Sequence, residues 1–186
     1  MKKEGKLFLC MFTLLFAACK STPENRTEIT VNGMIYDTNN SPVVNYFITI
    51  DETVECVSDI GGRFTLKNVS KGQHLLTGYG DGYLDMEQTV IITDKSQILY
   101  LRVPSIESRF EKAYEYIKEK EYFKAENCIK DILLSDENNT DALFFMGVIK
   151  QYQGFSEESF EYIRKIKEQG EGGYYVEEFE KIFSKK

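Results

Sequence analysis

The chain has 186 residues, which is enough for one medium-sized domain or two small ones. Hydrophobic residues make up 42% of it, so the composition supports a packed core and excludes wholesale disorder. The formal net charge is −7, and no cluster of lysine or arginine interrupts the acidic composition. Because an acidic surface repels phosphate backbones, we expect no nucleic-acid binding.

The first 18 residues have the pattern of a signal peptide. Lys2, Lys3 and Lys6 precede an uncharged apolar run at residues 7–18. A helix that spans a bilayer needs about 20 apolar residues, so this run is too short to do so. Its length fits the apolar region of a signal peptide, and we expect export from the cytoplasm.

The end of that run resembles the bacterial lipobox, on the residues Leu15-Phe16-Ala17-Ala18-Cys19. The resemblance implies that the Cys19 thiol carries acyl chains such as palmitate and becomes the new N-terminus, with residues 19–27 as a polar, lipidated tether. It also implies a lipid anchor in the cell envelope. Lys20 does not resemble an inner-membrane retention signal, so we expect the outer membrane, on its periplasmic face or at the cell surface. The alternative is an ordinary secretory signal cut near Ala18, with Cys19 as a free thiol.

Two further cysteines lie beyond the leader and the lipobox. Cys56 and Cys128 fall in different predicted modules, and nothing in the sequence places them within bridging distance. We expect two buried free thiols, and a disulfide between the modules is the alternative. No spacing of cysteine and histidine indicates a metal site, and we expect no cofactor.

Residues 28–103 have the pattern of short β-strands. Apolar residues alternate in short runs that glycine, asparagine, aspartate and proline interrupt. In one run we expect Val44, Tyr46, Ile48 and Ile50 to share a buried face. Six or seven such strands, with turns every 8–12 residues, predict a small antiparallel β-sandwich.

The same stretch resembles the carboxypeptidase regulatory-like domain. The residues that carry the resemblance are Val31, Gly33, Asp37, Pro42, the run Ser58-Asp59-Ile60-Gly61-Gly62-Arg63-Phe64-Thr65-Leu66, Gly72, Gly82 and Tyr83. The resemblance implies a sandwich of the transthyretin (prealbumin) type, common in bacterial envelope proteins and normally without catalytic activity. No peptidase active site is implied.

Residues 105–186 change to the period of amphipathic helices. Five stripes of apolar residues recur at intervals of three and four, and each predicts one helix. Ser156 is the expected N-cap of the fourth helix. We therefore predict an α+β protein of two modules, a β-sandwich at residues 28–103 and an all-α module at residues 105–186.

The helical stripes repeat. The positions paired at one interval are Phe110 and Phe144, Ala113 and Gly147, Ala125 and Ser159, Ile129 and Ile163, and Ile132 and Ile166. The interval is that of the tetratricopeptide repeat, about 34 residues, and these residues resemble that family. The resemblance implies two helical-hairpin repeats and a capping helix near residues 174–183. A plain helical bundle is the alternative.

Catalytic chemistry finds little support in the sequence. The chain has one histidine, His74, which alternates with Leu76 on a predicted strand. We interpret it as a structural histidine and not as a general base, because no Ser/His/Asp or Cys/His set can be assembled around it from the sequence. We therefore expect no enzyme and no catalytic residue.

Residues 78–85 alternate glycine with tyrosine and aspartate. Our interpretation is a strand that glycine relaxes before a packed tyrosine. Tyr79 and Tyr83 could instead contact a glycan, and the aspartates could bind calcium, although the spacing lacks the ligands of an EF-hand.

Tyr114, Tyr116 and Tyr152 are the expected contact residues of the helical module, since tyrosine is enriched at interface hot spots. The leading hypothesis is a non-enzymatic, membrane-anchored envelope lipoprotein that acts as a protein-protein interaction or scaffold module. The alternative is a glycan-binding lipoprotein that uses the loops of the sandwich.

Overall fold

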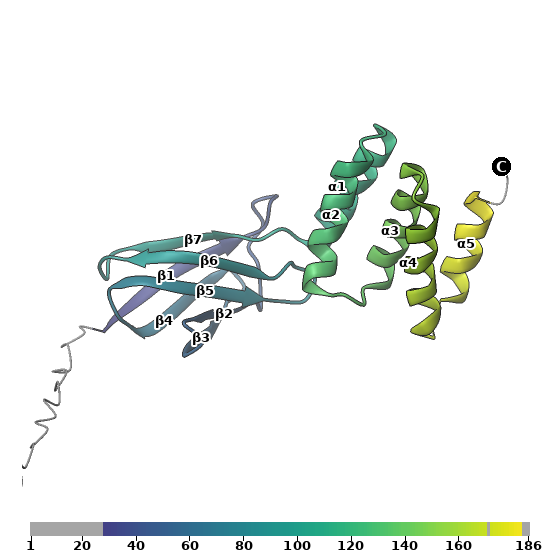
Figure 1. Cartoon of the computed structure of the whole chain (residues 1–186). Helices are drawn as coiled ribbons and strands as arrows, with labels where there is room; N and C mark the ends of the chain where they lie inside the picture. The colour runs from purple at the N-terminus through teal and green to yellow at the C-terminus, as the bar shows by residue number, and fades with distance from the viewer. Residues whose placement is uncertain (1–27, 171, 184–186) are drawn as a thin grey trace, which may run out of the picture.

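The computed structural model describes residues 28–170 and 172–183. Seven strands are followed by five helices, which confirms the predicted α+β layout of two modules. The strands are β1 (Ile29–Tyr36), β2 (Phe47–Ile50), β3 (Val54–Val57), β4 (Arg63–Val69), β5 (Gly72–Tyr79), β6 (Met86–Ile92) and β7 (Ile98–Arg102). The helices are α1 (Ile106–Lys118), α2 (Tyr122–Ser135), α3 (Thr140–Gln153), α4 (Ser156–Glu168) and α5 (Gly173–Phe183). The two modules lie end to end (Figure 1).

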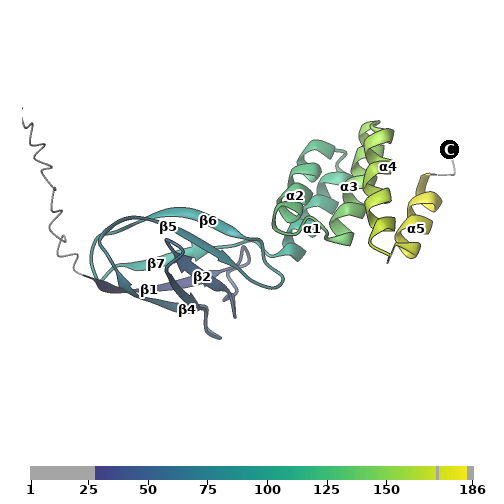
Figure 2. The ribbon, with the colours of Figure 1, turned by 60° about the horizontal axis from the view of Figure 1, so that its bottom comes forward.

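The strands form two sheets that face each other (Figure 2). One sheet has the order β4-β1-β7 and the other β3-β2-β5-β6. The second sheet is antiparallel throughout, but β1 and β7 pair in parallel, with Asn32 opposite Ile98. The prediction of an antiparallel sandwich was therefore wrong for one strand pair. The two strands are the first and the last of the module, and all the others lie between them in the chain, so no short hairpin forces them to run in opposite directions.

Alternation along the strands places the core between the sheets. Tyr46, Ile48 and Ile50 are buried on one side of β2, as expected. Val44 was expected beside them but is exposed, and Val43 is buried in its place. The reason is a local irregularity before β2, where Asn45 has a φ of 56°. That conformation shifts the alternation by one residue.

Each helix buries part of the stripe that its sequence predicts, whereas the stripe residues Tyr114, Phe160 and Ile182 are exposed. The buried positions include Ala113 on α1, Ala125 and Ile129 on α2, Met146 on α3 and Ile166 on α4. Successive helices pack against one another in chain order, from α1 on α2 to α4 on α5. One predicted cap was wrong: Ser156 is the first residue of α4, and Phe155 occupies the N-cap without a side-chain hydrogen bond.

The positions that the sequence pairs at the repeat interval are buried to a similar degree. Gly147 lies where α3 crosses α4, and a Cβ atom there would be 3.0 Å from Ile163 and 3.4 Å from the Ser159 carbonyl oxygen. The Ser159 hydroxyl donates to the Gly147 carbonyl oxygen at 2.7 Å. Ala113 and Ala125 are the corresponding buried small residues of α1 and α2. Small residues at these positions let the two helices of each hairpin approach closely.

The junction between the modules is built from backbone contacts. The loop after β5 lies against the start of α1, because the Ile106 amide donates to the Gly82 carbonyl oxygen at 2.9 Å and the Leu84 amide to that of Pro104 at 3.0 Å. The Asp85 amide also donates to the Ser135 hydroxyl at the end of α2, at 2.9 Å. One hydrophobic cluster continues from the sandwich into α1, α2 and α3. These contacts fix the direction of the helices relative to the sheets.

Candidate functional site

Helix α3 presents a stripe that the neighbouring hairpin helices leave partly open. Phe144, Val148 and Tyr152 follow one another at intervals of four residues, so they lie on one face of the helix. Phe144 and Val148 are half-buried and Tyr152 is 43% exposed. Met146, two residues from Phe144 and therefore on the opposite side of α3, is buried. Helix α3 therefore offers an apolar, aromatic surface on its open side.

Helices α1 and α5 lie beside this stripe. Ring contacts join the neighbouring helices, with centroid distances of 5.4 Å for Phe144–Tyr175, 5.4 Å for Tyr152–Phe183 and 5.2 Å for Phe110–Phe145. The Tyr175 hydroxyl of α5 also donates to the Asp141 carboxylate of α3 at 2.6 Å. These contacts place α1, α3 and α5 in one layer, and α2 and α4 form the other.

We call the open surface of this layer the odd-helix face. Its members are Tyr114 on α1, Phe144, Val148 and Tyr152 on α3, and Tyr175 and Ile182 on α5. Tyr114 is 56% exposed and Ile182 is 43% exposed. Glu107 and Glu111 precede Tyr114 on the same side of α1 and add negative charge to the rim. Exposed aromatic residues beside charged groups are typical of a protein contact surface.

The structure separates the three tyrosines that the sequence proposed as contact residues. Tyr114 and Tyr152 belong to the odd-helix face, whereas Tyr116 lies two residues from Tyr114 and therefore points to the other side of α1. Tyr116 is half-buried against the core, with the Lys124 ammonium 5.4 Å above its ring. The aromatic and aliphatic partners on α3 and α5 were missed. The repeat interval could have found them, because it aligns Tyr114 with Val148 and with Ile182.

A buried ion pair lies beneath the helical hairpins. The Glu126 carboxylate of α2 accepts hydrogen bonds from Lys150 at 3.0 Å and from Gln153 at 2.8 Å, and Lys130 lies 2.6 Å from it. The side chains of Glu126 and Lys150 are only 6% and 9% exposed. Burial raises the pKa of Glu126, but the hydrogen bonds from these three side chains outweigh it and hold the pKa at about 2. The ion pair ties α2 to α3 and thereby supports the odd-helix face from behind.

Tyr79 and Tyr83 do not form a common site. Tyr79 is 55% exposed on the outer side of the β3-β2-β5-β6 sheet, where its ring stacks on Phe47 at 5.0 Å and 10°. Tyr83 packs edge-on against the buried ring of Tyr46 at 6.2 Å. Phe47 is also 44% exposed, so the two stacked rings form an exposed aromatic pair on this sheet.

The glycines near Tyr79 make room for Tyr46. A Cβ atom at Gly78 would lie 2.5 Å from the Tyr46 ring and 2.7 Å from the Phe47 carbonyl oxygen. The Tyr46 hydroxyl lies 2.9 Å from the Gly78 carbonyl oxygen and 2.8 Å from that of Leu84. Burial raises the pKa of Tyr46, so the group stays a neutral donor. The glycine-rich stretch therefore has a packing role, in agreement with our interpretation of the sequence.

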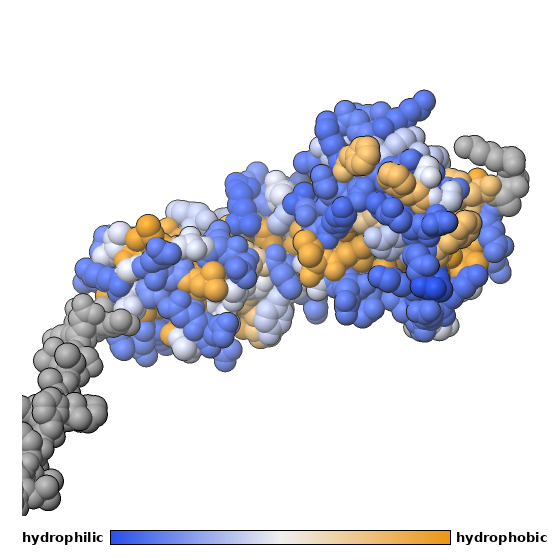
Figure 3. All heavy atoms as spheres, viewed as in Figure 1, coloured by the Kyte–Doolittle hydropathy of each residue, from blue (hydrophilic) through white to orange (hydrophobic). Residues whose placement is uncertain are grey.

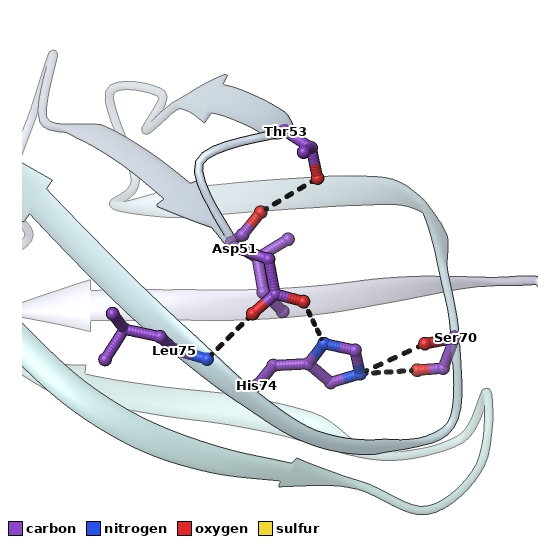
Figure 4. Close-up of polar contacts among 6 residues, drawn as sticks. Asp51, Thr53, Ser70, His74 and Leu75 are labelled. Atoms are coloured by element: carbon purple, nitrogen blue, oxygen red, sulfur yellow. Dashed lines mark hydrogen bonds and ion pairs between the residues drawn. The ribbon is translucent and has the colours of Figure 1, made fainter.

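His74 is buried between two turns of the sandwich (Figure 4). Its Nδ1 atom lies 2.5 Å from the Asp51 carboxylate, and its Nε2 atom lies 2.9 Å from the Ser70 carbonyl oxygen and 3.4 Å from the Ser70 hydroxyl. The Leu75 amide donates to the same carboxylate at 2.9 Å. Hydrogen bonds from His74 and Leu75 lower the pKa of Asp51. The chain thus brings together an Asp/His/Ser set that the sequence did not reveal: the β4–β5 turn places Ser70 beside His74, and the pairing of β2 with β5 brings Asp51 to it.

The geometry of this set fits a clamp better than a catalytic triad. In a triad, the histidine Nε2 accepts the serine proton. Here Nε2 is closer to the Ser70 carbonyl oxygen than to the hydroxyl, so it is oriented to donate. His74 therefore links the β2–β3 turn to the β4–β5 turn, as a structural histidine does.

Cys56 and Cys128 are both free thiols. Burial raises the pKa of the Cys56 thiol to about 11 and also raises that of Cys128, so neither is a reactive thiolate at neutral pH. Within residues 28–170 and 172–183, no group of three histidine, cysteine or acidic residues could hold a metal ion. In the same part of the chain, no helix has both the length and the apolarity to cross a membrane. The predicted signal peptide, Cys19 and the tether lie outside the described residues.

Comparisons with known proteins give little beyond the fold. No family model matches the chain, and no curated protein matches it. Among solved structures, it is similar to a chain of the type II cohesin–X-dockerin complex of Acetivibrio cellulolyticus, with 21% identity, a TM-score of 0.35 and coverage of 40% of this chain and 56% of that one. It is also similar to the major pilin subunit of Bacillus cereus, with 9% identity, a TM-score of 0.32 and coverage of 41% and 28%.

A third similar structure is the catechol 1,2-dioxygenase of Acinetobacter sp. ADP1, with 8% identity, a TM-score of 0.35 and coverage of 46% and 55%. This chain therefore spans little more than half of the cohesin–X-dockerin chain and of the dioxygenase, and less than a third of the pilin. Identities and TM-scores this low carry no argument about function.

Proposed function

We propose that the chain is a non-enzymatic lipoprotein of the bacterial envelope whose helical module docks a protein partner through the odd-helix face. In this proposal, acyl chains on Cys19 hold the protein at the outer membrane, and the sandwich acts as a spacer or second contact. The observation that supports it most is the row of exposed and half-buried aromatic and aliphatic side chains from Tyr114 to Ile182. A monomeric surface seldom leaves such a patch open without a binding role.

The helical module fits two tetratricopeptide-like repeats and a cap. At the close-approach position of each first helix stand Ala113, Gly147 and, at the same interval again, Lys181. The small residues let α2 and α4 pack closely, whereas the long side chain of Lys181 is 69% exposed and would keep a further helix away. Glu177 and Glu180 make the same side of α5 polar. This pattern supports α5 as the capping helix that ends the array.

The sandwich fits the carboxypeptidase regulatory-like domain in its two facing sheets. Phe64 and Leu66, which carry part of that resemblance, are buried in its core. A domain of this kind, placed between a lipid anchor and a helical module, would hold the odd-helix face away from the membrane. Two or three acyl chains anchor a protein far more firmly than one, at about 0.8 kcal/mol per buried methylene.

The docking proposal is tested by affinity capture from detergent-solubilised membranes with the full chain. We expect a specific envelope protein to be retained by the wild type and lost with the double variant Tyr114→Ala, Ile182→Ser. The matched control is Ile60→Ser, because Ile60 is 87% exposed on the sandwich. Retention of the same partner by the odd-helix variant, or its loss from the control, would contradict the proposal.

The anchor is tested separately on the same full chain. We expect mass spectrometry of the mature protein to find acyl chains on Cys19, and Cys19→Ser to release the protein from membranes. An unmodified thiol at Cys19 would exclude the lipid anchor but would leave the docking surface untouched.

A glycan-binding lipoprotein is the second candidate. It is favoured by the exposed Phe47–Tyr79 pair, with Val57 beside Phe47 on the same side of the sheet. Exposed aromatic rings can stack on sugar rings, and Tyr79 is 55% exposed. Retention on cell-wall polysaccharide that Tyr79→Ala abolishes and Tyr114→Ala does not would favour this function over protein docking.

A further inference from the structure

Leu134 is the most exposed large apolar residue of the helical module. It lies in the last turn of α2 and is 85% exposed, although it is flanked by Leu133, which packs in the core. A leucine at this position gains nothing for the fold, since it contacts little of the core. Its place in the layer of α2 and α4 puts it on the other side of the module from the odd-helix face.

Two hollows lie on either side of Leu134. One, of about 310 Å³, is lined by α2, α3 and α4, and its apolar lining comes from Leu133, Leu143, Met146 and Tyr162. The other, also about 310 Å³, lies at the module junction between Leu84 and Pro104 on one side and α1 and α2 on the other. Leu134 lines both of them. Figure 3 shows apolar surface gathered in the same region, where the helices meet the sandwich.

Charges of opposite sign lie at the rim of the first hollow. Glu137 follows the end of α2, and Lys165 lies across the hollow on α4. Within the described ranges, neither has an ion-pair partner, although the Lys165 ammonium lies 5.7 Å from the ring of Tyr162. Lys130, which is paired with Glu126, also lines this hollow. Among the described residues, the surface therefore carries a protruding apolar side chain, an apolar hollow, an unpaired carboxylate and an unpaired ammonium group.

Such a surface is complementary to itself. In a two-fold dimer, both copies use the same patch, so that a residue i meets residue j of the partner while j meets i. A projection and a hollow on one patch satisfy this condition, and so do a carboxylate and an ammonium group. A different protein would need to match all four features by a surface of its own, whereas a second copy already has them.

We propose that the chain forms a symmetric dimer through this patch, which we call the Leu134 patch. Leu134 of each copy inserts into the hollow between α2, α3 and α4 of the other, and Glu137 of each copy pairs with Lys165 of the other. The odd-helix face lies in the other helical layer and stays open, so the dimer presents two docking faces. The two sandwiches extend from the junction and place both anchors on one assembly.

The test is sedimentation equilibrium of the full chain in a density-matched detergent, over a dilution series. We expect the wild type to dimerise and Leu134→Asp to weaken the dimer by at least about 100-fold, because each variant dimer loses two buried leucines. The control is Ile60→Asp, which places the same charge at an equally exposed apolar position of the sandwich and should leave the dimer intact. Circular dichroism checks that each variant keeps its helices.

A charge exchange tests the pairing itself. Glu137→Lys and Lys165→Glu should each weaken the dimer, since each places like charges together, and the double variant should restore it. A monomeric wild type, a dimer that survives Leu134→Asp, or a double variant no better than the single ones would overturn the proposal. None of these results bears on capture of the partner by Tyr114 and Ile182, so the two proposals fail independently.

Discussion

The two modules bury polar groups in different ways. In the sandwich, Ser58 is a deeply buried neutral group: its hydroxyl donates to the Val43 carbonyl oxygen at 2.7 Å and accepts from the Tyr46 amide at 2.9 Å. Asp37 and His74 are also buried there, but the Asp51 carboxylate that pairs with His74 is 46% exposed. In the helical module, the charges of Glu126 and Lys150 are both buried and pair with each other. Neutral hydrogen bonds do not depend on pH between about pH 3 and 9, whereas a buried carboxylate does. The comparison predicts that acid and side-chain truncation affect the helical module first.

The largest expected effect is that of Glu126→Ala. It removes one of the two carboxylates that hold the buried Lys150 ammonium, while Glu158 stays 3.0 Å from it. Breaking a buried pair outright costs about 3–5 kcal/mol, so we expect a loss at the lower end of that range. Urea unfolding of the full chain, followed by circular dichroism at the helix band, measures the loss. Glu115→Ala, on the exposed side of α1, is the control and should change the free energy of unfolding by less than about 0.5 kcal/mol. A similar small loss for Glu126→Ala would show that the ion pair does not hold the hairpins together.

Acid should remove the same contribution without a mutation. The pKa of Glu126 is held at about 2 in the folded chain, below its usual value of 4.5. A lowered pKa stabilises the fold above the unfolded value, so the contribution of roughly 3 kcal/mol is complete at neutral pH and is lost as the pH falls from about 5 toward 2. The measurement is the difference in unfolding free energy between the wild type and Glu126→Gln. This difference should shrink across that range, and a constant difference would contradict the assignment.

Alanine substitutions at two buried glycines should change the free energy of unfolding by different amounts. Gly78→Ala places a Cβ atom 2.5 Å from the Tyr46 ring and 2.7 Å from the Phe47 carbonyl oxygen, and we expect a loss of about 1–3 kcal/mol. Gly147→Ala meets the flexible end of Ile163 at 3.0 Å, and Ala113 already occupies the equivalent position of α1. Its gain in helix propensity, about 1 kcal/mol, should offset the contact. Thermal unfolding of both variants measures which one loses more stability. An equal loss for the two variants would contradict the prediction.

Among the destabilising variants, Tyr46→Phe should lose the least stability. The variant keeps the ring between Gly78 and Tyr83 but removes the hydroxyl that lies between the carbonyl oxygens of Gly78 and Leu84, which should cost about 1–2 kcal/mol. Because no charge is involved, the loss should be the same at pH 4 and pH 7. Tyr79→Phe, with an exposed ring, should have almost no effect. A pH-dependent loss for Tyr46→Phe would contradict the neutral role of the hydroxyl.

The helical module could be predicted from the sequence more completely than the sandwich. Its contacts are between residues three and four apart and between neighbouring helices, so periodicity alone finds buried residues such as Ala113, Ile129 and Met146. The sandwich depends on pairs that lie far apart in the chain. Nothing in the pattern of β1 and β7 indicates that they pair in parallel, and the shift of one residue that buries Val43 arises from the backbone of Asn45.

The candidate site shows the same division. Tyr114 and Tyr152 could be proposed from the sequence because exposed tyrosines on amphipathic helices are visible there. Their neighbours Val148 and Ile182 were missed, although the repeat interval aligns both with Tyr114. Which side chains of α3 and α5 come into contact depends on how α4 packs between them. Nothing in the sequence distinguishes Glu126 and Lys150 from ordinary surface charges. Only the packing of α2 against α3 buries them together.

The sequence by itself determined the order of the modules, the helical period and most of the buried stripes, because these follow from the spacing of apolar residues along the chain. Only the tertiary structure decided which charges are buried, which tyrosines share a surface, and that Asp51 meets His74. Each of these depends on residues that pairing and packing bring together across tens of positions. Local propensity carries no information about such distances, whereas the burial of apolar surface between whole elements sets them.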